Sequence, residues 1–199
     1  MCKKKFSISK IQRDFEIIEC FCKNLTGNQT KDKLHINHLT VKVRFEFFRK
    51  VIANFLEEKY QGKDVLEYDE YIYLSKSKKK VKKNIFDAKN FLTFNYENKV
   101  YNLLMPDLNR YKDEFLDSGA EEAHFKEFSK FMMLNKISKT QKRENIITMF
   151  WNFFEDSILK YKGINHENFF YYLKEIEFKF NYTYEEQVHI LKASLYKYF

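Results

Sequence analysis

The side chains that most often perform catalysis or bind zinc form no recognisable arrangement in this sequence. Cys2, Cys20 and Cys22 are an odd number of cysteines without the partner cluster that a zinc site requires. We interpret them as reduced structural thiols of a cytosolic protein. No Ser-His-Asp order, glycine-rich phosphate loop or Cys-His pairing stands out either. The sequence therefore does not point to nucleophilic catalysis or to a zinc centre.

The most conspicuous chemical feature is a run of lysines. Six of the eight positions from Lys76 to Lys83 are lysine. Such a run is typically a solvated loop, and it can also contact phosphate groups. The candidate phosphate contacts in this run are Lys78, Lys79 and Lys80.

Composition limits the classes of protein that this chain can belong to. It has 199 residues, 36 Lys+Arg against 28 Asp+Glu, and a formal net charge of +8, which permits nucleic-acid, membrane-surface or acidic protein partners. With 44% hydrophobic residues, including 22 Phe and 14 Tyr, it should fold around a substantial core. No apolar stretch approaches the roughly 20 residues that cross a bilayer. No secretory signal follows the charged start, so we expect a cytoplasmic protein without a membrane partner.

The first 60 residues have the helix order of a helix-turn-helix. Apolar residues at three- and four-residue steps predict a helix over Lys10–Cys22. Thr26 with Gln29 matches a capping box, which predicts a short helix ending near Leu34. A tight turn at residues 35–37 and a long helix over His38–Glu58 follow. The apolar stripe expected on the long helix consists of Leu39, Val43, Phe47, Val51 and Phe55.

The middle of the chain reads as strands. Val65–Leu74 is aromatic and rich in β-forming residues, and it predicts one strand. Phe91–Phe94 and Lys99–Met105 flank a short turn, so we predict an antiparallel hairpin that Pro106 ends. A short strand over Phe131–Leu134 is a further expectation.

Three helices are expected at the end of the chain. The apolar pattern predicts a helix over Asn145–Lys160 and a second one from His166 to about Lys179, with Asn165 as its cap. The last helix begins near Glu185, after a second capping box. This box is formed by Thr183 and Glu186.

Several segments, taken in order, resemble one family. Asn145-Ile-Ile-Thr-Met-Phe-Trp151 resembles an N-G-I-E-x-F-W motif, Glu67-Tyr-Asp-Glu-Tyr71 an E-x-D-E-S motif, and Phe169–Asn181 an F-Y-L-H-L-K-E-x-E-F-R-F-N motif. These motifs are typical of short insertion-sequence transposases of the ISXO-like group. The remaining matching segments are Leu25–Thr30, Leu39–Phe45, Lys99–Tyr101 with Pro106, and Lys160–Ile164.

The resemblance implies a fold and an activity. It implies an α+β, mixed α/β chain with a helix-turn-helix DNA-binding domain over residues 1–60. A ribonuclease H-like domain over residues 61–199, shortened near 107–143, would follow. Such proteins bind the DNA ends of a mobile element as oligomers. They cleave and join phosphodiester bonds with two Mg²⁺ or Mn²⁺ ions held by acidic side chains.

The resemblance also implies which residues would carry catalysis. Asp69 and Asp117 match the two metal-binding aspartates, and Asn145 would supply an amide oxygen at the third position. The alternatives are a surface carboxylate for Asp69, a loop carboxylate for Asp117 and a helix N-cap for Asn145. Thr148 stands where the motif has its glutamate, and a hydroxyl cannot replace a carboxylate at a metal pair. Glu155 replaces an expected lysine or arginine.

The segment that would read DNA departs from the usual pattern at two positions. Lys31 stands where a small residue is expected, and His35 where glycine would supply a positive φ. The candidate DNA contacts on the long helix are Thr40, Lys42, Arg44 and Arg49. Three functional hypotheses remain open at this level. They are a transposase-like protein with impaired cleavage, a catalytically dead DNA-binding remnant or regulator, and a helical protein-interaction module.

Overall fold

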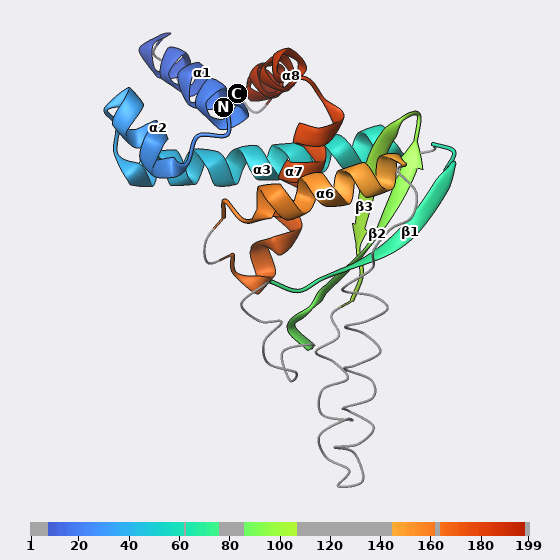
Figure 1. Ribbon diagram of the computed structural model, residues 1–199. Coiled ribbons are helices and arrows are strands. Elements are labelled where there is room, and N and C mark those ends of the chain that lie inside the picture. Colours follow the sequence, from blue (N-terminus) through green and yellow to red (C-terminus); the bar gives the residue numbers. More distant parts are fainter. Residues whose placement is uncertain (1–7, 62, 76–85, 107–144, 162–163, 198–199) are drawn as a thin grey trace, which may run out of the picture. The chain divides into compact units, whose positions relative to one another are not determined.

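The computed structural model describes residues 8–61, 63–75, 86–106, 145–161 and 164–197, and in these residues the fold is α+β. Contacts divide the chain into two compact units. The helical unit joins residues 1–62 with residues 157–199, and the sheet unit spans residues 63–156 (Figure 1). Three features of the sequence lie outside the described residues: the lysine run over Lys76–Lys83, the candidate ligand Asp117, and the predicted strand over Phe131–Leu134.

The helix-turn-helix order is confirmed in the helical unit. Helices α1 (Ile8–Cys22), α2 (Gly27–Leu34) and α3 (His38–Tyr60) follow one another, with a three-residue turn between α2 and α3. Thr26 and Gln29 form the capping box of α2: the Thr26 backbone N–H donates to Gln29 Oε1 at 2.8 Å. Asn37 caps α3, because its Oδ1 accepts the Leu39 N–H at 2.7 Å. These local hydrogen bonds set both helix starts.

The turn contains a residue in the left-handed conformation. His35 has φ 52° and ψ 44°, the conformation that glycine adopts most readily. Its N–H still bonds to the Lys31 carbonyl oxygen, which closes the C-terminal end of α2. The positive φ expected at this position from the sequence is therefore present.

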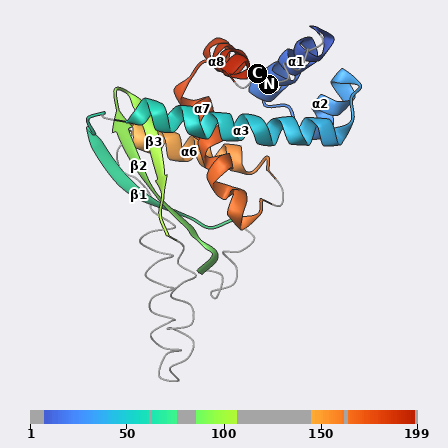
Figure 2. The same ribbon diagram turned by 180° about the vertical axis from the view of Figure 1, so that it is seen from behind.

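The last two helices belong to the same core as the first three. Helix α7 (Phe169–Asn181), preceded by a 3₁₀ turn η5 (His166–Asn168), packs against α3, and α8 (Tyr184–Lys197) lies beside α1 (Figures 1 and 2). Phe21 of α1, for example, meets Phe45 and Phe48 of α3 edge to face, with ring centroids 5.0 and 5.6 Å apart. This packing groups residues 157–199 with residues 1–62, whereas the sequence predicted a division after residue 60.

The C-terminal helices largely match their predicted positions. The η5 turn delays α7, so its N-cap is Asn168 instead of Asn165. Helix α8 begins as predicted from its capping box, in which the Thr183 N–H donates to Glu186 Oε2 at 2.8 Å. Among the described helices, none combines the length and the apolar character needed to span a membrane.

The apolar stripe predicted on α3 is wrong at its first two positions, whereas Val51 is buried and Phe47 and Phe55 pack against the core. Leu39 and Val43 are exposed, with relative accessibilities of 64% and 53%. A strict four-residue step advances about 40° around a helix at each step, so it drifts away from a single face over the length of α3. The buried face combines steps of three and four residues through Val41, Phe45, Phe48, Ile52 and Leu56, and Val51 and Ala53 are buried beside it.

The sheet unit is built on an antiparallel meander. Strands β1 (Glu67–Tyr73), β2 (Lys89–Tyr96) and β3 (Lys99–Leu104) pair in the order β1-β2-β3. The predicted hairpin is confirmed, with a two-residue turn in which Glu97 and Asn98 have φ of 47° and 58°. The aromatic face of α6 (Ile146–Ile158) packs on this sheet: Tyr71 and Trp151 have ring centroids 4.7 Å apart. The further strands of a ribonuclease H-like core stay a prediction.

Candidate functional site

The first two turns of α3 present an exposed face to solvent. His38 and Lys42 are exposed together with the aliphatic side chains of Leu39 and Val43, and Glu46 continues the face one turn further. We call these five residues the α3 face. Helix α3 follows α2 after a three-residue turn, which is the helix order that the sequence predicted. The α3 face lies at the start of this helix.

The four predicted DNA contacts on α3 have different surroundings. Lys42 is exposed and lies on the α3 face, whereas Thr40 is half-buried. Arg44 Nη2 donates to Asp14 Oδ2 at 2.8 Å, and Asp14 is only 3% exposed, so this pair fastens α3 to α1. Arg49 departs most clearly from its predicted role as a DNA contact, because the residue is only 8% exposed and its side chain points into the protein.

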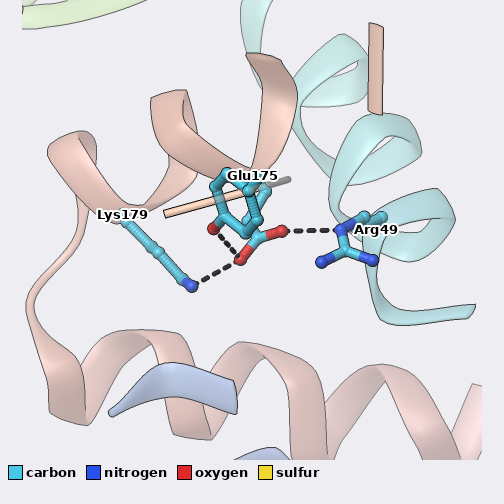
Figure 3. Close-up of polar contacts among 4 residues, drawn as sticks. Arg49, Glu175 and Lys179 are labelled. Carbon is cyan, nitrogen blue, oxygen red and sulfur yellow. Dashed lines mark hydrogen bonds and ion pairs between the residues drawn. The ribbon is translucent and has the colours of Figure 1, made fainter. Parts of the chain in front are cut away.

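Arg49 belongs to a buried ionic cluster. Its Nε donates to Glu175 Oε2 at 2.6 Å, while the other carboxylate oxygen of Glu175 accepts from Lys179 Nζ at 2.5 Å and from the Tyr161 hydroxyl at 2.7 Å (Figure 3). Glu175 is only 1% exposed. The cluster fastens α7 to the middle of α3, and it explains how charged side chains are tolerated inside this core.

The protonation states of the cluster follow from this geometry. Burial alone would raise the pKa of Glu175, but the charges of Lys179 and Arg49 and the hydrogen bonds from Lys179 and Tyr161 hold it below its ordinary value. Burial and the Glu175 charge raise the pKa of Tyr161. Although burial acts to lower the pKa of Arg49, the Glu175 carboxylate raises it. Glu175 is thus an anion and Arg49 and Tyr161 are protonated at neutral pH.

In the sheet unit, Glu67 and Asp69 lie on the same face of β1, since side chains alternate along a strand. Glu67 accepts one amide hydrogen bond on each carboxylate oxygen, from Asn95 Nδ2 at 3.1 Å and from Asn145 Nδ2 at 3.2 Å. Asp69 Oδ1 accepts the backbone N–H of Glu70 at 2.8 Å. The structure therefore joins predicted site residue Asn145 to Glu67, a residue that the sequence did not single out.

Asn145 is the N-cap of α6. Its Oδ1 accepts the Thr148 backbone N–H at 2.9 Å, and Thr148 Oγ1 accepts the Asn145 backbone N–H at 3.0 Å. This exchange is a capping box in which threonine takes the third helical position. Thr148, which stands where the transposase motif has glutamate, therefore has a structural role at the start of α6.

The described residues contain only part of the metal site that the resemblance implies. Among the described residues, no three or more His, Cys, Asp or Glu side chains are grouped so that they could hold a metal ion. The Asn145 oxygen already caps α6, and both Glu67 oxygens already accept amide hydrogens. Asp117, the second predicted metal ligand, lies outside the described residues. Of the two predicted metal-binding aspartates, only Asp69 therefore lies in the described part of the chain.

Trp151 serves the core of the sheet unit. It is 3% exposed, and its Nε1 donates to Thr93 Oγ1 at 2.9 Å; the Thr93 hydroxyl in turn donates to Asn102 Oδ1 at 2.7 Å. The Tyr71 hydroxyl donates to Glu155 Oε1 at 2.6 Å. Burial and this contact with Glu155 raise the pKa of Tyr71. Glu155 therefore accepts a hydrogen bond from Tyr71 of β1. The comparison with the motif did not predict this role.

The chain was compared with family models, curated proteins and solved structures. None of them matches it.

Proposed function

We propose that this protein binds duplex DNA through the α3 face. The observation that supports the proposal is the placement of two exposed aliphatic side chains, Leu39 and Val43, beside exposed Lys42 on the second helix of a helix-turn-helix. In this motif the first residues of the second helix contact base edges. Aliphatic groups there can pack against thymine methyl groups, and lysine can pair with guanine or phosphate.

The electrostatics of the chain agree with this partner. The formal net charge is +8, and a positively charged chain attracts the phosphate backbone before any base is read. Arg44 and Arg49 are committed to Asp14 and Glu175, so we assign the phosphate contacts to exposed lysines such as Lys42.

Resemblance to insertion-sequence transposases makes element-end DNA the expected ligand and an oligomer the expected active form. Cleavage by Asp69, Asp117 and Asn145 with Mg²⁺ or Mn²⁺ is the second candidate function. The hydrogen bonds that occupy Asn145 and Glu67 favour binding without cleavage, because they leave few carboxylate or amide oxygens for a metal. We therefore propose a DNA-binding protein of transposase ancestry.

A selection of duplexes from a random pool tests this function. We expect the full chain to enrich a short preferred sequence, and we expect Leu39→Ala and Val43→Ala to relax the preference at one base step each. A lost apolar contact to a base is expected to reduce discrimination by about 1–3 kcal/mol. Ala193→Ser, at an exposed position of α8, is the control and should leave the preference unchanged. Enrichment of no sequence, or an unchanged preference in both aliphatic variants, would contradict reading by the α3 face.

A further inference from the structure

The helical unit contains a cavity of about 340 Å³, and three residues of the α3 face, His38, Lys42 and Glu46, lie at its lining. It lies between the loop joining α1 to α2, the first half of α3, and α7 with the residues preceding it. Four of its lining side chains are cationic, and two are carboxylates. The cationic side chains that line it are Lys42, Arg49, Lys160 and Lys179.

Arg49 is the buried anchor of this cavity. Its side chain is only 9% exposed, its Nε is bonded to Glu175, and its guanidinium carbon lies 4.1 Å from the ring centroid of Tyr172. Both Nη groups lack a hydrogen-bond partner in the part of the chain that the structure describes. Figure 3 draws no interaction at either of these nitrogens among the residues shown. Because Arg49 lies at the lining of the cavity, these two donor groups can bond to a ligand or to water there.

The charge balance of the cavity favours an anion. Glu175 is already neutralised by Lys179 and Arg49 together, which leaves one positive charge over within the cluster. Lys42 and Lys160 add two cations at the lining, whereas Glu46 adds one carboxylate. A cationic ligand would therefore be repelled, and a neutral one would leave the guanidinium unsatisfied. A phosphoryl group offers several acceptor oxygens and negative charge, and guanidinium binds it in a bidentate manner.

We propose that this cavity binds a phosphoryl group, with the two Nη groups of Arg49 as the bidentate donor and Lys42 and Lys160 as additional cations. The Tyr172 ring and Glu175 hold the guanidinium in a fixed orientation, so little conformational freedom is lost when the anion enters. The volume of about 340 Å³ lies at the small end of the range of ligand pockets, which suits a small phosphate ester. The same chemistry is available from a phosphate on a DNA strand.

Binding of free phosphate compounds tests the site without any DNA, so its result is independent of DNA reading by the α3 face. The probes are inorganic pyrophosphate and adenosine monophosphate, measured by calorimetry with the full chain. We expect saturable binding with Kd below about 1 mM. Arg49→Lys keeps the charge beside Glu175 but loses the bidentate geometry, and it should weaken binding at least about tenfold. Lys160→Gln, at an exposed position, should weaken it several-fold, whereas Lys59→Gln at the far end of α3 should not.

A second experiment tests whether the bound phosphoryl group belongs to the backbone of a DNA duplex. If the free probes do not bind, but Lys160→Gln lowers the salt dependence of duplex binding by about one phosphate contact or Arg49→Lys weakens duplex binding, the cavity takes a backbone phosphate. Circular dichroism shows whether Arg49→Lys is folded, and Lys160→Gln replaces it if it is not. The proposal is overturned if neither probe binds up to about 10 mM and neither variant changes duplex binding.

Discussion

The buried cluster around Glu175 makes a sharp prediction about stability. Glu175→Gln keeps the shape of the side chain and one acceptor oxygen but removes the negative charge between Arg49 and Lys179. All three side chains are at most 9% exposed, so water compensates for only part of the lost charge. The substitution therefore leaves two buried cations without a countercharge.

The magnitude follows from the number of contacts that are lost. Removing one partner of a buried ion pair costs about 3–5 kcal/mol. The glutamine oxygen can still accept one of the three hydrogen bonds that Glu175 receives, from Arg49, Lys179 or Tyr161, so we expect the lower end, about 3 kcal/mol. For a chain of this size, that loss corresponds to a fall of roughly 6–12 °C in Tm.

The effect should depend on pH in a defined direction. The folded pKa of Glu175 is lowered from its ordinary value of 4.5, so its stabilisation is fully present above pH 4.5. As the pH falls from 4.5 through the lower folded pKa, the carboxylate of the wild-type chain becomes protonated. The difference between the wild-type chain and Glu175→Gln should therefore shrink in this acidic window and stay constant from pH 5 to pH 7.

Urea denaturation followed by circular dichroism measures both quantities. Glu58→Gln is the matched control, because Glu58 is exposed on the same helix, α3, as Arg49, and it should change the free energy of unfolding by less than about 0.5 kcal/mol. The triple variant Arg49→Met/Glu175→Leu/Lys179→Met should recover most of the loss, since it removes all three charges together. The reasoning is refuted if Glu175→Gln costs no more than the control, or if its cost does not change below pH 4.5.

Three further predictions concern other parts of the molecule. Burial raises the pKa of the Cys22 thiol to about 12, so iodoacetamide at pH 8 should modify Cys22 only after unfolding; peptide mass mapping that finds it alkylated in the folded chain contradicts this burial. Asn37→Ala removes the cap of α3 and should lower the free energy of unfolding by about 1 kcal/mol in urea titrations, while Asn37→Asp should retain it. With Mg²⁺ or Mn²⁺, we expect no nicking of labelled duplex by the purified chain; nicking that Asp69→Asn abolishes would show that a metal centre does form.

Local features of the fold were predictable because their causes lie close together in the sequence. The capping boxes at Thr26 and Thr183 and the cap at Asn37 act within three residues, so the starts of α2, α3 and α8 could be predicted. The β2–β3 hairpin was also predictable, because its turn is formed by the adjacent residues Glu97 and Asn98.

Features that depend on distant contacts were not predictable. Arg49 pairs with a residue 126 positions away, and nothing near Arg49 in the sequence distinguishes it from an exposed arginine on a reading helix. A signal was present in α7, where Glu175 stands next to the buried Ile176 and must find a cationic partner. For the candidate metal site, the motif located Asn145 correctly at the start of a helix. It could not show that the Asn145 amide donates to Glu67.

Binding of duplex DNA by the α3 face should depend on salt concentration, and this dependence is the decisive measurement. Fluorescence anisotropy of a labelled duplex should give a plot of log K against log salt with a slope of roughly −0.9 for each phosphate that the protein neutralises. Lys42→Ala should make this slope shallower by about one contact, whereas Lys59→Ala, at the opposite end of α3, should leave it unchanged. A flat salt dependence, no binding at about 50 mM salt, or equal effects of the two substitutions would contradict DNA binding by the α3 face.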